Sequence, residues 1–138
     1  MKTVILTSSK FAGEVELRYN QSNMLWYFEN RSDMDSTAQA WLITNMPIHT
    51  ADITHFIDRT KTLKVTEIRK EISFEDFWNK YDNKAVSSKK KALTRWKNMS
   101  KVQRYKAYYY ISIYLSALPQ GVSRKYAETY LNSEIWEK

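Results

Sequence analysis

Positive side chains are concentrated in one stretch of the sequence, where phosphate binding is the chemistry they could support. Eight lysine and arginine residues lie between Lys89 and Lys106, and no acidic residue occurs between Asp82 and Glu128. If this stretch is helical, cations one helical turn apart repel each other, so negative charge from outside the helix is needed to offset the repulsion. Phosphates supply it, because cations that neutralise them release counterions. A solvated basic face without a ligand is the alternative. The predicted phosphate contacts are Lys84, Lys89, Lys90, Lys91, Arg95, Lys97, Lys101 and Arg104.

Residues for catalysis or metal binding are scarce. His49 and His55 are six positions apart, which does not place them on one helical face at the spacing of a metal-binding motif. The chain has no cysteine, and Gly13 and Gly121 are too isolated to form a phosphate-binding glycine-rich loop. We therefore predict that the protein is not an enzyme and that it uses no cofactor and no metal.

Tyrosines crowd the segment that follows the basic stretch. They could stack on nucleic-acid bases, but five tyrosines on one helix cannot all face one direction, so the sequence favours core packing for most of them. Tyr110 is the predicted exception, because the helical period places it beside Gln103 and Lys106. The five residues are Tyr105, Tyr108, Tyr109, Tyr110 and Tyr114.

The composition is that of a folded chain with an uneven charge distribution. Of the 138 residues 43% are hydrophobic, and there are only two glycines and two prolines, so a disordered chain is excluded. Residues 1–66 carry seven basic and seven acidic side chains, so the whole net charge of +7 lies in residues 67–138. Apolar runs are too short for a membrane span or a signal peptide. We expect a soluble, cytoplasmic protein that contacts no membrane.

The N-terminal part, residues 1–70, has the pattern of a small antiparallel sheet with two helices. Residues 3–7, 14–19 and 24–29 read as strands, and the turn residues 20–23 predict that 14–19 and 24–29 form an antiparallel hairpin. Gly13 marks a bulge or a turn before the second strand. Ser32 or Ser36 is the predicted cap of one helix and Thr50 that of a shorter one. Residues 63–72 are expected to form a further strand that pairs with the hairpin.

The C-terminal part, residues 71–138, is predicted to be helical, which makes the fold class α+β. Capping boxes begin helices at Ser73 and Ser100, and Ser87 or Ser88 begins the basic helix. Beyond Lys106, the helix that begins after Ser100 is apolar or aromatic nearly all round, so we expect a long central core helix or a subunit interface. A last short helix is expected over residues 124–131.

Residues 73–138 resemble a segment at the C-terminus of phage replication proteins, the replisome organisers and helicase-loader-like proteins. In that family the segment is associated with DNA binding. Its aromatic residues would form a scaffold that displays the lysine helix outward. In it Phe77, Trp78 and Tyr81 would pack against Trp96, Tyr130 and Trp136. The pattern is carried by Phe74, Phe77, Trp78, Tyr81, Lys84, Lys90, Lys91, Ala92, Trp96, Tyr126, Thr129, Tyr130, Leu131, Asn132, Trp136 and Glu137.

The resemblance implies a small, non-catalytic, nucleic-acid-binding protein of a phage or prophage, an accessory of phage DNA replication. A virion-associated structural or interaction protein is the alternative, and an inhibitor of a host defence system is also left open. The implied partners are nucleic acid, DNA first, bound through the basic helix, and other phage proteins. The implied location is the host cytoplasm, with the virion as a second option. Self-association through the long helix is left open.

Overall fold

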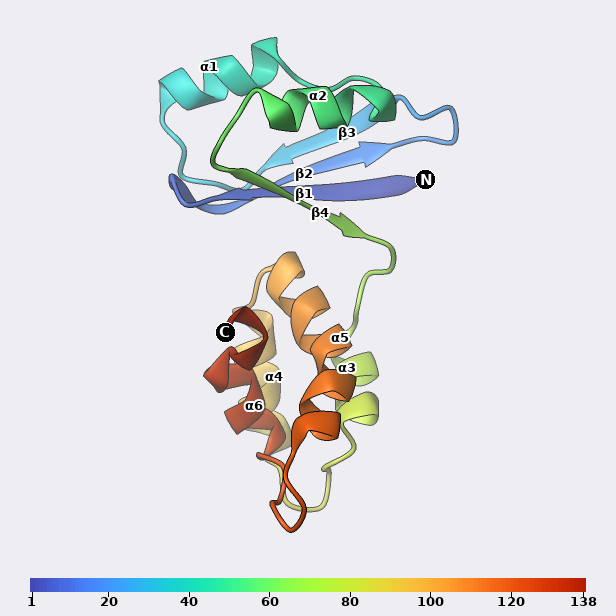
Figure 1. Cartoon of the computed structure of the whole chain (residues 1–138), viewed down its shortest axis with the longest axis vertical. Helices are drawn as coiled ribbons and strands as arrows, with labels where there is room; N and C mark the ends of the chain where they lie inside the picture. Colours follow the sequence, from blue (N-terminus) through green and yellow to red (C-terminus); the bar gives the residue numbers. More distant parts are fainter. The chain divides into compact units, whose positions relative to one another are not determined.

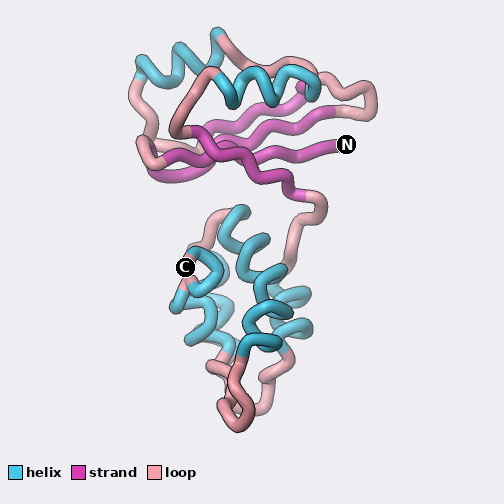
Figure 2. The backbone as a smooth tube through the Cα atoms, viewed as in Figure 1, coloured by secondary structure: helices cyan, strands magenta, loops and turns pink.

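The computed structural model describes the whole chain, which divides into two compact units, Met1–Arg69 and Lys70–Lys138 (Figure 1). The first unit combines a four-stranded antiparallel sheet with two short helices, and the second consists of helices and loops (Figure 2). The α+β prediction is therefore confirmed. None of the helices has the length and apolar character needed to cross a membrane.

The sheet of the N-terminal unit has the strand order β3-β2-β1-β4, and all neighbours are antiparallel. Its strands are β1 (Lys2–Ser8), β2 (Phe11–Tyr19), β3 (Leu25–Asn30) and β4 (Leu63–Ile68). The last strand joins the sheet, but its predicted partner is wrong: β4 runs beside β1, with Val65 opposite Leu6, and not beside the hairpin of β2 and β3. β4 ends at Ile68, four residues earlier than predicted.

Two helices cover one face of this sheet (Figure 1). They are α1 (Ser36–Thr44) and α2 (Ile53–Asp58), the latter preceded by a 3-10 turn, η1 (Thr50–Asp52). Alternate strand residues point toward them because side chains of a strand alternate between its two faces. The core contains Val4, Leu6, Val15, Leu17, Tyr19, Met34, Leu42, Ile53 and Phe56.

The predicted caps of both helices are wrong. Asp35, not Ser32 or Ser36, caps α1, because its carboxylate lies 2.8 Å from the Ala38 amide and accepts a hydrogen bond from it. Ser32 instead donates its hydroxyl hydrogen to the Asn30 side chain. At the second site the His49 Nδ1 accepts from the Ala51 amide, so the cap lies one residue before Thr50.

The helices of the C-terminal unit begin largely where the sequence predicts. They are α3 (Phe74–Tyr81), α4 (Lys89–Lys97), α5 (Lys101–Ala117), α6 (Ala127–Ser133) and a final 3-10 turn, η2 (Ile135–Glu137). Both capping boxes are confirmed, and Ser88 rather than Ser87 caps α4. α6 starts three residues later than predicted. The backbone at Lys125 is held outside the helix, because it donates to the Tyr114 hydroxyl and accepts from that of Tyr81.

An aromatic cluster forms the core of this unit. The Phe77 ring lies 5.2 Å from that of Trp96 and 6.1 Å from that of Tyr130, and Tyr130 lies 5.5 Å from Trp136, measured between ring centroids. The Tyr130 hydroxyl donates to the Ala107 carbonyl, so a core tyrosine keeps a polar partner. The predicted scaffold role of these aromatic residues is therefore confirmed by their contacts.

Candidate functional site

The basic helix α4 is attached to the aromatic core by one face. Ala92 and Trp96 are buried on that face, four residues apart, as expected for the same side of a helix. Because the side chains of Lys90, Lys91 and Lys97 project from the rest of the helix surface, all three are exposed. The fold of the unit thus presents part of the predicted site to its surroundings.

Other predicted contacts are neutralised within the protein. Lys89 lies 3.5 Å from Glu75, Arg95 lies 3.1 Å from Glu134, and Lys101 lies 3.9 Å from Glu71, measured between side-chain nitrogen and oxygen. These glutamates come from segments before and after the basic stretch. Tertiary contacts therefore supply part of the negative charge that the basic stretch was predicted to need from outside.

Arg104 and Lys84 have structural partners of a different kind. The Arg104 guanidinium donates to the carbonyl oxygens of Trp96, at 3.0 Å, and Lys97, at 3.3 Å. These carbonyls belong to the C-terminal end of α4, where a cation and a hydrogen-bond donor both stabilise the helix. The Lys84 ammonium donates to the Asn79 side chain at 2.7 Å. Neither residue is directed at an external ligand in this structure.

Three of the eight predicted cations remain unpaired and exposed: Lys90, Lys91 and Lys97, which we call the α4 lysine face. They span two turns of helix, or about 10 Å at 1.5 Å per residue. Thr94 lies between them and donates its hydroxyl hydrogen to the Lys90 carbonyl. Of the eight predicted contacts, this short row of three is the part for which the structure gives no partner within the protein.

The tyrosines of α5 pack largely as predicted, with one correction. Tyr114 is buried, whereas Tyr109 is the most exposed of the five at 44%. Tyr110, predicted to be the exposed one, packs partly buried against the core, because it lies one turn from the buried residues Ala107 and Tyr114 on the same face of α5. The ammonium of Lys80 lies 4.2 Å from the ring centroid of Tyr108, and burial lowers the pKa of Lys80.

Acidic and histidine side chains do not form a metal-binding group, since no three of them converge in the structure. His49 is used as a helix cap, as described above. The remaining polar groups of the C-terminal unit serve its own architecture; for example, the Glu128 carboxylate accepts from the Ser88 amide at 2.8 Å.

Residues 69–134 match the model of a protein family, the Legionella vir region protein LvrA C-terminal domain. The match covers almost the whole C-terminal unit, including all four of its helices, and just under half of the chain. No curated protein and no solved structure matches the chain.

This match corrects the identification made from the aromatic and lysine pattern. The segment is similar to the LvrA C-terminal domain and not to the DNA-binding segment of phage replication proteins. The predicted role in phage DNA replication is therefore wrong, and the alternative of a virion-associated phage protein falls with it. Six of the residues that carried the resemblance are buried aromatic residues, a type of core that unrelated helical units can share.

Proposed function

We propose that the C-terminal unit is a non-catalytic docking module that binds an acidic surface of a partner protein through the α4 lysine face. The observation that carries the proposal is the contrast within the basic stretch. Five of its predicted contacts are held by side chains or carbonyls of the same unit, whereas Lys90, Lys91 and Lys97 are exposed without an ion pair. The cytoplasmic location predicted from the sequence is part of this proposal.

The spacing of the three lysines supports a protein partner. Acidic side chains on successive turns of a partner helix are separated by about 5 Å to 10 Å, which matches a row of lysines on two turns of α4. Electrostatic complementarity of this kind contributes to specificity and to the association rate. Nucleic acid, predicted from the sequence, stays a prediction for the same surface, and three contacts would give it only a shallow salt dependence.

Fluorescence anisotropy on the full chain tests this proposal. The probes are a labelled, glutamate-rich helical peptide and a labelled oligonucleotide, each titrated at low and at physiological salt. Replacing Lys90, Lys91 and Lys97 with Glu should weaken peptide binding about tenfold or more, because three attractive contacts become repulsive. Thermal stability should change little, since these side chains are exposed.

A charge-matched control distinguishes the effect of the α4 lysine face from the effect of the protein's net charge. Lys125 is exposed in the same unit but lies outside α4, so Lys125→Glu should bind the peptide as the native chain does, whereas Lys90→Glu should not. Equal losses in the two variants would mean that only overall charge matters, and the docking proposal would be wrong. If the chain binds the oligonucleotide and not the peptide, the partner of the α4 lysine face is nucleic acid and the proposal of a protein partner is wrong.

A further inference from the structure

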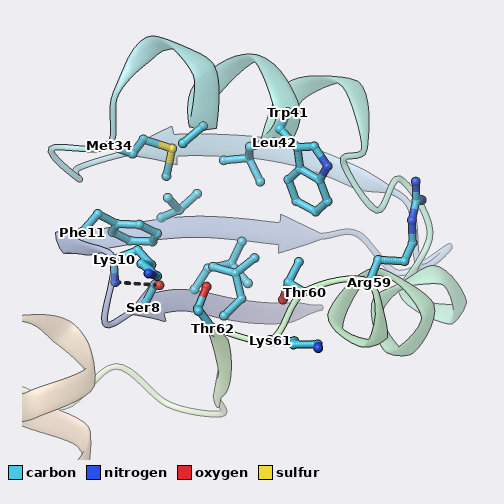
Figure 3. A pocket seen from close by; sticks show the side chains of 14 residues that line it. Ser8, Lys10, Phe11, Met34, Trp41, Leu42, Arg59, Thr60, Lys61 and Thr62 are labelled. Atoms are coloured by element: carbon cyan, nitrogen blue, oxygen red, sulfur yellow. Dashed lines mark hydrogen bonds between the residues drawn. The ribbon is translucent and has the colours of Figure 1, made fainter.

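The N-terminal unit contains a pocket that none of the predicted sites uses. It has a volume of about 340 Å³ and lies between α1, the β1–β2 end of the sheet and the segment 59–63 (Figure 3). Its volume falls at the lower end of the range of ~300 to 1,000 Å³ typical of small-molecule sites. The pocket is partly open to its surroundings, so a small molecule can enter it.

Apolar side chains form the body of the pocket. Leu6 and Val15 come from the sheet, Leu42 from α1 and Leu63 from the start of β4. Ala38, one turn before Leu42 on α1, has a side chain too short to fill the space between helix and sheet. Figure 3 shows the Trp41 indole at one end of this space and Phe11 with Met34 at the other.

The charged groups that line the pocket are all positive. They are Lys10, Arg59 and Lys61, and no aspartate or glutamate is among the lining residues. Arg59 and Lys61 lie toward the Trp41 end in Figure 3, and Lys10 lies toward the Phe11 end. The Arg59 guanidinium donates to the Asn45 side chain at 2.6 Å, which fixes it there and leaves further N–H groups for a ligand.

We infer that this pocket binds a small amphiphilic anion, with an apolar tail between α1 and the sheet and a carboxylate or phosphate head beside Arg59 and Lys61. The apolar body favours the tail through burial of its surface. The cations favour a negative head, and a guanidinium binds carboxylate and phosphate well. A cationic amphiphile would meet like charge at both ends of the pocket. This site lies in the N-terminal unit and is independent of the α4 lysine face.

Two-dimensional ¹H–¹⁵N NMR of the full chain can test the site with probes of equal tail length. The probes are decanoate, decyl phosphate, decanol and decylammonium, each below its micelle concentration. The two anions should shift the amide signals of Leu6, Ala38 and Leu63, and decanol and decylammonium should bind about tenfold or more weakly. The inference fails if no probe shifts these signals, or if decylammonium binds as well as decanoate.

Paired variants locate the tail and the head. Ala38→Leu should fill the pocket and abolish decanoate binding while keeping or raising the melting temperature, whereas Ala40→Leu, on an exposed position of α1, should bind normally. Lys61→Glu should weaken decanoate but not decanol, and Lys64→Glu, which lies outside the pocket, should change neither. Decanoate binding that survives both Ala38→Leu and Lys61→Glu would overturn the assignment.

Discussion

Gly13 shows how one residue determines a local structure. It lies in β2 where the register with β1 shifts, so the predicted bulge is confirmed, and its φ of +88° is in the region that favours glycine. A Cβ atom at this position would lie 2.3 Å from the Arg31 carbonyl oxygen. Glycine is therefore required at this position both by the positive φ and by the close approach of the Arg31 backbone.

Gly13→Ala should accordingly be far more harmful than the same change at the other glycine. Gly121 also has a positive φ, of +82°, but no atom lies within 4 Å of an added Cβ. We expect Gly121→Ala to cost about 1 to 2 kcal/mol of unfolding free energy from backbone strain alone, and Gly13→Ala to cost clearly more. Chemical denaturation of both variants measures the difference, and equal losses would show that the contact with Arg31 is unimportant.

Tyr19 makes the stability of the N-terminal unit sensitive to alkaline pH. Burial, together with the charge of Asp52, raises its pKa to about 12, and its hydroxyl donates to the Pro47 carbonyl at 2.8 Å. The unfolded chain, with a pKa near 10, loses this proton first, so the contribution of Tyr19 is complete below pH 10 and disappears as the pH approaches 12.

The Tyr19→Phe variant isolates this effect. Near neutral pH it should be less stable than the native chain by about 1 to 3 kcal/mol, because the Pro47 carbonyl loses its donor inside the core. The gap should narrow as the pH rises from 10 to 12, since only the native chain then gives up stability through Tyr19. Urea denaturation at a series of pH values measures it. A gap that stays constant would contradict the raised pKa.

Among the elements, helix starts were predictable where the signal is local. The capping boxes at Ser73 and Ser100 need only a residue three positions later, Asp76 and Gln103, so sequence alone identified them. The caps of α1 and η1 were predicted wrongly. The prediction chose a nearby serine or threonine, whereas the preceding loop places Asp35 and His49 at the helix starts. The preceding loop determines which residue stands at the start of a helix, and the capping preferences of single residues do not describe that loop.

Removal of the α5 cap should weaken that helix by a predictable amount. In Ser100→Ala the Gln103 amide loses its acceptor, so we expect a loss of about 1 kcal/mol in the free energy of unfolding. Ser116 lies near the other end of α5 and is exposed, and Ser116→Ala should change stability by only a few tenths of a kcal/mol. Thermal and chemical denaturation distinguish the two variants. Similar losses in both would mean that the cap contributes little.

At the scale of the whole molecule, the phosphate contacts predicted for the basic stretch stay a prediction, and what the sequence did not reveal is the set of partners that these cations have within the protein. The basic stretch was correctly located on a helix, and the aromatic residues that support it were correctly identified as scaffold. The partners of its cations could not be foreseen, because Glu71, Glu75 and Glu134 are brought to it only by the tertiary fold. The pocket of the N-terminal unit was missed for the same reason, since its walls come from distant segments.

The C-terminal unit has the features of a part that folds by itself. Its ring contacts, such as Phe77 with Trp96 and Tyr130, lie within residues 70–138, as do the side-chain caps of α3, α4 and α5. Small domains of this length often fold alone when their core is well formed. We therefore expect residues 70–138, expressed separately, to be monomeric and to melt cooperatively, as measured by circular dichroism and light scattering.

Trp96→Ala in the same segment provides the decisive comparison. The indole is 4% exposed and packs against Phe77, so its removal should cost about 3 to 5 kcal/mol, enough to unfold a small unit of marginal stability. Lys90→Glu, on the opposite side of the same helix, should leave the melting temperature nearly unchanged. A segment that melts without cooperativity, or that tolerates Trp96→Ala, would show that the aromatic cluster is not what holds this unit together.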